Sequence, residues 1–320
     1  MLKFKTDGWS GAISEDFTFE NVRKIAQMLA IYIISEKPDS KPILIGHDSR
    51  FLADQFATAV TQVMESSGIP CFIAERDLPV PVAAWAATGR DTSGTILITG
   101  GNYPAYYCGL RIFPAKKVAP EMVARKVDTY FILEHSTFQG DSPSPELLSY
   151  QSARTLIERS TKKGKLEHVD PRDRYLKYAA ALVDRGAIKK AALKIVVDPF
   201  YGSGRGYLDR LLQQLGCRVE AIRDYRDVLF GGLVPEPVEN NLAELKNQVA
   251  ESKADLGIAL SGGAGRFAVI DREGNYHSGE ALLGLLKKKK KQVIEGDGIL
   301  GGLQIVELIA KEGLRVLSEL

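Results

Sequence analysis

The sequence predicts an α/β protein built from two doubly wound units, and three observations carry this prediction. Short apolar runs alternate with amphipathic stretches over the first 130 residues, and the same alternation restarts near residue 174. Gly-rich or Arg-containing segments follow the apolar runs, where parallel strands present ligands. The runs near 43–46, 193–198 and 255–260 each lead into Gly or Asp and then an arginine, which suggests a divergent internal repeat.

The elements of the first unit follow from periodicity. Apolar residues recur on one helical face over 19–35, which predicts a helix, and the continuous apolar run at 42–46 predicts a strand covered on both faces. A helix over 53–67, a strand over 70–74, a short helix near 82–87 and a strand over 95–99 complete the unit.

The second half repeats this order. A helix over 174–185, strands over 193–198 and 219–222, and a helix over 239–253 precede a strand at 255–260 and a hairpin with its turn at 273–275. The Ser-, Pro- and Gly-rich segment 134–160 predicts an interdomain connection with a helix inside it. We therefore expect domains at 1–140, 173–254 and 255–320, with a connection at 141–172.

Composition narrows the class of protein. The 320 residues include 42 Lys+Arg and 40 Asp+Glu, with 45% hydrophobic residues, which is typical of a folded globular chain and excludes a disordered one. The net charge of +2 argues against a dedicated nucleic-acid binder. The run Lys287–Lys291 follows an apolar helical stripe, so we interpret it as a solvated helix end and keep nucleic-acid binding as the less favoured alternative.

The expected location is the cytoplasm. No stretch approaches 18 consecutive apolar residues, and the N-terminus lacks an apolar signal core, so neither membrane spanning nor secretion is predicted. The cysteines Cys71, Cys108 and Cys217 are far apart and form no CxxC pair, which favours a reducing compartment.

Four loops at predicted strand ends are candidate sites. They cover residues 6–11, 47–50, 99–104 and 261–266, and their Gly-rich backbone with nearby arginines suits an anion. Tight turns with surface arginines are the alternative. The GSGRG turn at 202–206 departs from the G-x-G-x-x-G spacing of a dinucleotide site. Our candidates for substrate or anion binding are Asp7, Asp48, Arg50, Arg111 and Arg266.

Taken together, these loops resemble one family along essentially the whole chain, the α-D-phosphohexomutases (phosphoglucomutase and phosphomannomutase). The segments that carry the likeness are FKTDGWSG, IGHDSRFLADQFA, LPVPVAAWA, VVDPFYGSGRGYL, LFGGLVPEPVENNLAELK and ADLGIALSGGAGRFAVID. The resemblance implies three similar α/β domains and a smaller fourth. It also implies a phosphoserine, a Mg²⁺ ion held by three aspartates, a sugar-recognition loop in the third domain and a phosphate-binding loop in the fourth.

Residue by residue, most of that machinery is missing. In the family's T-A-S-H-N-P motif, Gly101 stands where the phosphoserine would be and Asn102 where the histidine would be. In the metal motif D-G-D-A-D-R, the three aspartates are Ser261, Gly263 and Gly265, and only Arg266 is retained. The arginine of the family's N-terminal G-W-R-G motif is Ser10 in this chain. We therefore expect no catalytic residue at these positions, no Mg²⁺ site and no cofactor.

The likeness also skips a segment. After HSGEALLGLL the chain passes through KKKKKQVI into EGDGILGGLQIVELIAKEGLRVLSEL, which resembles the end of the family's third domain and omits its sugar loop. The expected fold is two complete phosphohexomutase-type α/β/α domains plus a shortened third unit, with the fourth domain absent. The helix near 298–311 is apolar on more than one face, so it must pack on domain two or on another chain.

The leading functional hypothesis is a pseudoenzyme: a non-catalytic phosphohexomutase homologue used for binding, scaffolding or regulation. Its partner would be another protein or a second copy, bound through the shortened third unit. The alternatives are a sensor that binds a sugar phosphate through Arg50, Arg111 and Arg266, or a residual enzyme that uses Asp7, Asp48 or His47.

Overall fold

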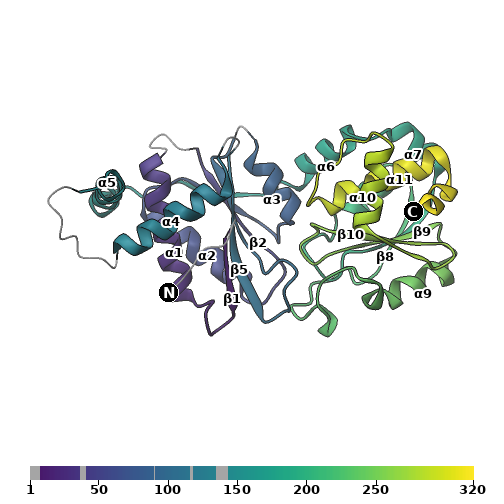
Figure 1. The fold of residues 1–320 in the computed structure, drawn as a ribbon, viewed down its shortest axis with the longest axis horizontal. Helices are drawn as coiled ribbons and strands as arrows, with labels where there is room; N and C mark the ends of the chain where they lie inside the picture. Colours follow the sequence, from purple (N-terminus) through teal and green to yellow (C-terminus); the bar gives the residue numbers. More distant parts are fainter. Residues whose placement is uncertain (1–7, 37–40, 90, 116–117, 135–142) are drawn as a thin grey trace. The chain divides into compact units, whose positions relative to one another are not determined.

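The computed structural model describes residues 8–36, 41–89, 91–115, 118–134 and 143–320, and they form two compact α/β/α units (Figure 1). The first unit lies within residues 8–170, apart from the short segments 78–82 and 101–105, which group with the second. The second unit holds those segments and residues 171–320. Among the described residues, no helix combines the length and apolar character that crossing a membrane requires.

The first unit is built on a mixed sheet, six-stranded over the described residues. Its strands, in spatial order, are β1 (Gly8–Ala12), β5 (Tyr107–Pro114), β4 (Gly94–Ile98), β2 (Ile43–His47), β3 (Cys71–Ala74) and β6 (Leu166–Val169). Strands β4, β2, β3 and β6 run parallel, whereas β5 and β1 pair antiparallel. The predicted strands near 42–46, 70–74 and 95–99 are confirmed. Strands β1, β5 and β6 were not predicted.

Helices cover this sheet on both faces (Figure 1). They are α1 (Phe19–Glu36), α2 (Ala53–Ser66), α3 (Val80–Ala87), α4 (Pro120–Glu134) and α5 (Pro145–Arg159). Helix α1 packs against α2, α4 and α5, and the core beneath them includes Phe17 stacked on Trp9 with a ring-centroid distance of 4.9 Å. Phe56 from α2 meets Phe17 edge-on at 4.7 Å. The apolar faces that predicted the first two helices are therefore buried.

The expected connection at 141–172 is wrong, because most of this segment belongs to the first unit. Helix α5 begins at a Ser144 cap and buries Leu147, Tyr150 and Ala153 in the core shared with α1. Strand β6 then pairs parallel to β3 at the edge of the sheet. The predicted helix inside this segment is confirmed as α5. Its composition concealed its place in the core, since α5 presents Ser, Gln and Arg to solvent and needs only a narrow apolar stripe.

The second unit has a smaller mixed sheet, five-stranded over the described residues. Its strands, in spatial order, are β11 (Tyr276–Ser278), β10 (Phe267–Asp271), β9 (Leu256–Leu260), β7 (Lys194–Asp198) and β8 (Arg218–Ala221). Its helices are α6 (Arg172–Ala181), α7 (Arg185–Ala191), α8 (Leu208–Gln214), α9 (Ala243–Ser252), α10 (Gly279–Lys288) and α11 (Gly298–Glu312). Short 3₁₀ turns are η1 (Phe230–Gly232), η2 (Glu239–Asn241) and η3 (Leu314–Glu319).

The expected domain boundary at 254/255 is also wrong. Strand β9 pairs parallel to β7 in the centre of the second sheet, and β10 and β11 extend the same sheet. A boundary between β7 and β9 would leave the edge of a buried central strand unpaired, at the cost of its ladder hydrogen bonds. The expected third unit therefore loses β9, β10 and β11 to the second sheet, and helices α10 and α11 are its remaining α-helices.

Helix α11 resolves the choice left open for the apolar segment near 298–311. Every residue from 298 to 309 is buried, and α11 packs against α7, α8, β9 and β10 of its own chain. Two glycines allow this approach: a Cβ on Gly301 would lie 2.5 Å from Phe267, and one on Gly302 would lie 3.0 Å from Leu208. The apolar faces of α11 are therefore covered within the chain, and self-association through the rest of the shortened third unit stays a prediction.

The two sheets share one strand arrangement, which agrees with the expected internal repeat. In each sheet, a central strand (β2 or β7) has parallel neighbours on both sides. Beyond one of these neighbours (β4 or β9) come two more strands, each antiparallel to the strand before it. The segment after β4 reads Thr99-Gly100-Gly101, and the segment after β9 reads Ser261-Gly262-Gly263. The two candidate loops thus occupy the same position in the two repeats.

Candidate functional site

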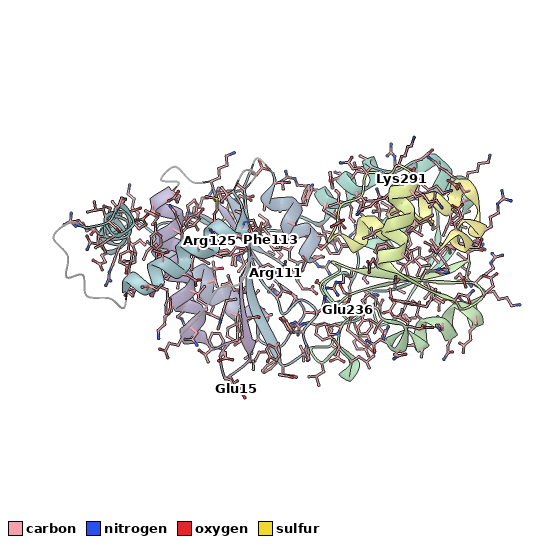
Figure 2. The ribbon with its side chains drawn as sticks, viewed as in Figure 1. Glu15, Arg111, Phe113, Arg125, Glu236 and Lys291 are labelled. Carbon is pink, nitrogen blue, oxygen red and sulfur yellow. The ribbon has the colours of Figure 1, made fainter. Side chains whose placement is uncertain are left out.

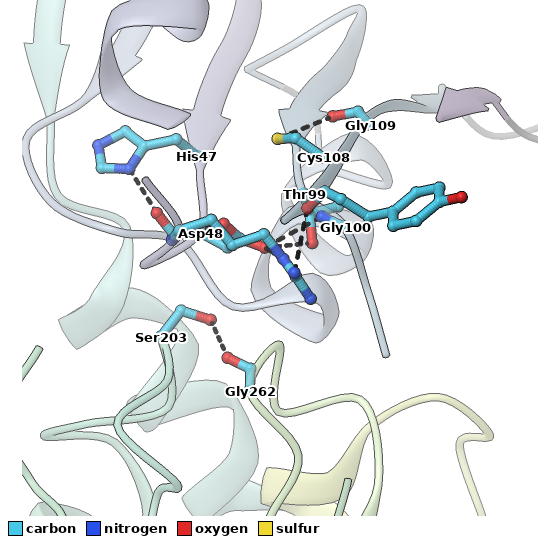
Figure 3. Close-up of polar contacts among 10 residues, drawn as sticks. His47, Asp48, Thr99, Gly100, Cys108, Gly109, Ser203 and Gly262 are labelled. Atoms are coloured by element: carbon cyan, nitrogen blue, oxygen red, sulfur yellow. Dashed lines mark hydrogen bonds and ion pairs between the residues drawn. The ribbon is translucent and has the colours of Figure 1, made fainter. Parts of the chain in front are cut away.

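In the first unit, polar groups gather around the carboxylate of Asp48, directly after β2 (Figure 3). Thr99 donates its hydroxyl to Asp48 Oδ2 at 2.7 Å, and the Gly100 amide donates to the same oxygen at 3.2 Å. The Arg50 amide reaches Oδ1 at 3.0 Å, and Arg50 Nε reaches Oδ2 at 3.2 Å. Asp48 is 2% exposed, so these donors hold a buried carboxylate and tie β2 to the turn after β4.

Arg50 is a structural residue in this arrangement. Its side chain is fully buried, and it also donates from Nη1 to the Tyr107 carbonyl at 3.1 Å. A buried guanidinium that is bound to a carboxylate and a carbonyl does not present its charge to solvent. The expectation that Arg50 contributes to an exposed anion site is therefore not supported by its position.

The other candidates of the first unit lie elsewhere. Arg111 projects from the middle of β5, where its guanidinium lies 5.3 Å from the ring centroid of Phe113 (Figure 2). Arg111 pairs with Leu97 of β4, which lies two residues before Thr99. Asp7 lies outside the described residues. The structure thus brings together Asp48 and Arg50 of the five candidates.

Gly101, the residue after Gly100, stands where the family motif has its phosphoserine. Gly101 has a φ of +56°, and a Cβ built there would meet no heavy atom within 4 Å. There is space at this position for a side chain, yet the residue offers no oxygen to phosphorylate. Its neighbour Asn102 carries an amide in place of an imidazole, so it cannot act as a general base near neutral pH.

The loop after β9 is a compact turn tied to its own unit. The Gly262 carbonyl accepts from the Ser203 amide at 2.8 Å and from the Ser203 hydroxyl at 3.2 Å (Figure 3). The Ser261 carbonyl accepts from Ala264, and the Ala264 carbonyl from Gly298. Substitution here is restricted, because a Cβ on Gly262 would lie 2.7 Å from Pro235.

These residues do not fit a Mg²⁺ ion. A magnesium site in a protein uses carboxylate oxygens, and Ser261, Gly263 and Gly265 supply none. The Ser261 hydroxyl, which could have been a neutral ligand, accepts from the Arg266 amide at 3.1 Å. Within the described ranges, no group of three or more His, Cys, Asp or Glu side chains is placed to hold a metal.

Arg266 is the exposed guanidinium of this loop. Its side chain is 64% exposed, and Nη1 donates to Glu236 Oε1 at 2.7 Å. Glu236, labelled in Figure 2, is mostly buried, with 16% of its side chain exposed. Arg266 therefore retains donors that face solvent, in contrast to Arg50.

A second buried ion pair was missed by the sequence analysis. Asp198 ends β7, and its carboxylate binds both Nε and Nη2 of Arg223, with Nε to Oδ1 at 3.0 Å. The guanidinium also lies 4.1 Å from the ring centroid of Phe200. Burial raises the pKa of Asp198, although Arg223 opposes that shift. The signal was available, since Asp198 and Asp48 lie at the carboxyl ends of equivalent strands, but their partner arginines lie at different sequence separations.

Arg76 is another residue that the sequence analysis missed. It follows β3 by two residues, and its Nε is buried without an acceptor among the residues described. A buried guanidinium N–H that lacks an acceptor is unusual in folded proteins. Sequence alone could not reveal it, because the tripeptide Glu75-Arg76-Asp77 looks like an ordinary charged loop.

The lysine run at 287–291 is largely neutralised by glutamates from the C-terminal part of the chain. Its ion pairs are Lys287 with Glu295, Lys288 with Glu319, Lys289 with Glu312 and Glu319, and Lys291 with Glu307. Lys291 is labelled in Figure 2. The run extends past α10, which ends at Lys288, and most of its charge is balanced locally.

The cysteines are buried thiols. Cys71, Cys108 and Cys217 are all free. Burial raises the pKa of Cys71 to about 12 and that of Cys217 to about 11, and it raises the pKa of Cys108 as well. Thiolate is the reactive form, so these side chains are poor nucleophiles near neutral pH.

The fold and these loops define a class: repeated α/β/α units in which equivalent Gly-rich turns follow equivalent strands. Residues 1–132 match the family model for the phosphoglucomutase/phosphomannomutase alpha/beta/alpha domain I, and residues 173–274 match the model for domain II. The chain belongs to the phosphoglucomutase/phosphomannomutase family. The second match extends through β10 into the hairpin turn, in agreement with the sheet and against a boundary at 254/255.

Individual relatives carry the same likeness. The chain is 28% identical over 287 residues to a "Probable phosphoglucosamine mutase" of Methanothermobacter thermautotrophicus, which covers 89% of this chain and 58% of that protein. It is 27% identical over 284 residues to a phosphoglucomutase/phosphomannomutase of Thermococcus kodakarensis, with 88% and 58% covered. The chain thus spans about three fifths of the length of these relatives.

Among solved structures, a phosphoglucomutase/phosphomannomutase family protein from Burkholderia thailandensis superposes with a TM-score of 0.73 at 17% identity. The superposition covers 100% of this chain and 80% of the other. At that identity the likeness supports the fold, and the chemistry has to be argued from the residues themselves.

Proposed function

We propose that this chain is a non-catalytic member of the phosphohexomutase family that acts as a binding or regulatory protein. The observation that carries the proposal is the loop 261–266, whose side chains include no carboxylate and whose backbone is engaged in its own turn. A dication there would lose its hydration shell without gaining an anionic ligand.

The nucleophile position supports the same proposal independently. Phosphoryl transfer needs a group to carry the phosphate and cationic charge to stabilise the transferring phosphoryl. Gly101 offers no oxygen, and its neighbour Asn102 offers no base. Because the two losses occur in different repeats, a single substitution would not restore the chemistry.

The polar cluster around Asp48 supports a scaffold role. Its residues hold one another: Asp48 binds Arg50, Thr99 and Gly100 inside the unit. These contacts stabilise the fold and do not require a substrate.

Phosphoenzyme formation tests this proposal. The chain would be incubated with Mg²⁺ and glucose 1,6-bisphosphate, and its intact mass would show no added phosphoryl group. The Gly101→Ser variant is the matched comparison, since a Cβ at this position meets no heavy atom within 4 Å, although the φ of +56° strains any side chain there. We expect that variant to fold and to remain unphosphorylated, because loop 261–266 still lacks carboxylates. A phosphorylated wild-type chain would contradict the proposal.

A sugar-phosphate sensor is the second candidate, favoured by the 64% exposure of the Arg266 side chain. Thermal unfolding with a hexose phosphate separates the two roles, because a ligand that binds only the folded state raises the melting temperature. A rise with hexose phosphate alone supports the sensor, and no rise supports the scaffold. A rise that depends on Mg²⁺ would support a residual enzyme instead.

A further inference from the structure

Arg76 occupies a defined place at the carboxyl edge of the first sheet. The register of β2 with β3 pairs Ile45 with Ile73, and continuing it places Asp48 level with Arg76. The register of β2 with β4 pairs His47 with Ile98, and the same continuation places Thr99 level with Asp48. By this continuation, Thr99, Asp48 and Arg76, which follow the ends of β4, β2 and β3, lie level with one another.

Asp48 does not neutralise Arg76 despite this neighbourhood. Its carboxylate accepts from the Arg50 amide and guanidinium, the Thr99 hydroxyl and the Gly100 amide. Three of these donors share Oδ2 and the fourth binds Oδ1, and none of them belongs to Arg76. The guanidinium of Arg76 is left without a carboxylate among the described residues, and its Nε is shielded from solvent.

A shielded charged N–H without an acceptor is costly to the folded state. In folded proteins, an ordered water or an ion completes the hydrogen bond of such a group. The carboxyl edge of parallel strands is also where α/β folds place their ligands. Because a guanidinium matches oxyanions in charge and in fork geometry, the missing acceptor is best supplied by an oxyanion.

We propose that Arg76 anchors an oxyanion subsite at the carboxyl edge of the first sheet, and that its ligand is a phosphate group. This subsite does not use Arg50, Arg111 or Arg266. The subsite rests on the proposed function in one respect: a family member that does not catalyse a reaction would act through the ligands that it binds. The phosphate could be inorganic or part of an ester, and the test separates these sources.

Thermal unfolding of the full chain provides the test, with inorganic phosphate in one arm, a hexose monophosphate in another, and chloride at matched ionic strength as the reference. Arg76→Met removes the donor and keeps an unbranched chain of similar length. Arg218→Met is the matched control, since Arg218 is exposed at the start of β8 in the second unit. We expect phosphate to raise the melting temperature of wild type and Arg218→Met by several degrees, and to leave Arg76→Met unchanged.

Without phosphate, Arg76→Met should melt at or above the wild-type temperature, because the substitution removes a buried donor that has no partner. A larger rise with the hexose monophosphate than with inorganic phosphate would assign the ester as the ligand. Equal phosphate responses in Arg76→Met and wild type, or the absence of any phosphate response, would overturn the subsite.

A measurement on the wild-type chain covers the case in which Arg76→Met fails to fold. Titration with inorganic phosphate should shift the side-chain Nε–H resonance of Arg76 in a nitrogen-15 spectrum, while that of Arg218 stays in place. An unchanged Arg76 resonance would overturn the proposal. Failure of the subsite leaves the phosphoenzyme test unaffected, and a phosphorylated chain would contradict the proposed function without removing the subsite.

Discussion

A Cβ atom on Gly100 would lie 2.5 Å from Nε of Arg50, so the buried guanidinium and the turn after β4 together restrict this position to glycine. The same Cβ would lie 2.7 Å from the Tyr107 carbonyl, which is backbone and cannot rotate away. The family motif has alanine at the position that Gly100 occupies. In this chain, the Arg50 guanidinium and the Tyr107 carbonyl leave no room for that alanine.

Gly100→Ala should destabilise the chain by about 1–3 kcal/mol, because the added methyl group overpacks a buried site. Chemical denaturation would measure the change. Gly284→Ala is the control, since this glycine lies inside α10 and a Cβ there meets no heavy atom within 4 Å. Alanine in that helix should stabilise the chain by about 0.5–1 kcal/mol. Equal stability of Gly100→Ala and wild type would show that Arg50 is free to move.

Asp48→Asn should cost about 3–5 kcal/mol of unfolding free energy, because it leaves the Arg50 charge buried without its counter-ion. Glu158→Gln serves as the comparison. Its partner is Arg154 in an exposed pair one helical turn away, for which we expect a change below about 0.5 kcal/mol. If both substitutions have the same small effect in urea titrations, the Asp48 cluster is not the structural centre described above.

The buried carboxylate of Glu307 predicts a loss of stability in acid. Burial alone would raise the pKa of Glu307, but hydrogen bonds from Lys291, Lys311 and the Asp184 amide outweigh it, so the native pKa is lowered. The native state then holds this group deprotonated more strongly than the unfolded state does. Its stabilising contribution is complete above the ordinary glutamate pKa of about 4.3 and is lost as pH falls through the lower native value.

Unfolding free energies of wild type and Glu307→Gln, compared from pH 7 to pH 3, check this sign. The variant should be less stable at pH 7, and the difference between the two should shrink toward pH 3. A difference that grows as the pH falls would mean that the native pKa of Glu307 is raised.

The lysine run should give no appreciable affinity for nucleic acid, because four of its five lysines pair with glutamates. Fluorescence anisotropy with a labelled DNA duplex at physiological salt should show no saturable binding below about 10 μM protein. Lys287→Gln combined with Lys288→Gln should give the same curve as wild type. Tighter binding that these substitutions weaken would assign the run to an external polyanion.

Local sequence patterns were sufficient to predict the central strands of both sheets. They failed to predict strands whose pairing partners are distant in the sequence. The runs that became β2 and β9 are uniformly apolar because both faces of those strands are buried, which periodicity detects. Strand β1 contains two glycines in five residues and pairs with β5, about a hundred residues later, so no local pattern marks it. The boundary at 254/255 failed for the same reason, since β9 pairs with β7 although α8, β8 and α9 lie between them in the chain.

The candidate site shows a similar division. Motif comparison identified the absent groups at Gly101, Ser261, Gly263 and Gly265, because an absence can be found from residue identity alone. It did not identify what each arginine does. Arg50 and Arg266 are both arginines of candidate loops, yet one is buried in an ion pair and the other is mostly exposed. Burial depends on tertiary packing, so only the structure separates them.

Mutase turnover tests the central claim most directly. The full chain would be assayed with the 1-phosphates of glucose, mannose and glucosamine, Mg²⁺ and the glucose 1,6-bisphosphate primer, and product would be followed over time. We predict a rate equal to the protein-free background for every substrate, because the chain has no nucleophile at Gly101 and no carboxylates in loop 261–266. A rate that scales with protein concentration and disappears when Mg²⁺ is removed would contradict the account.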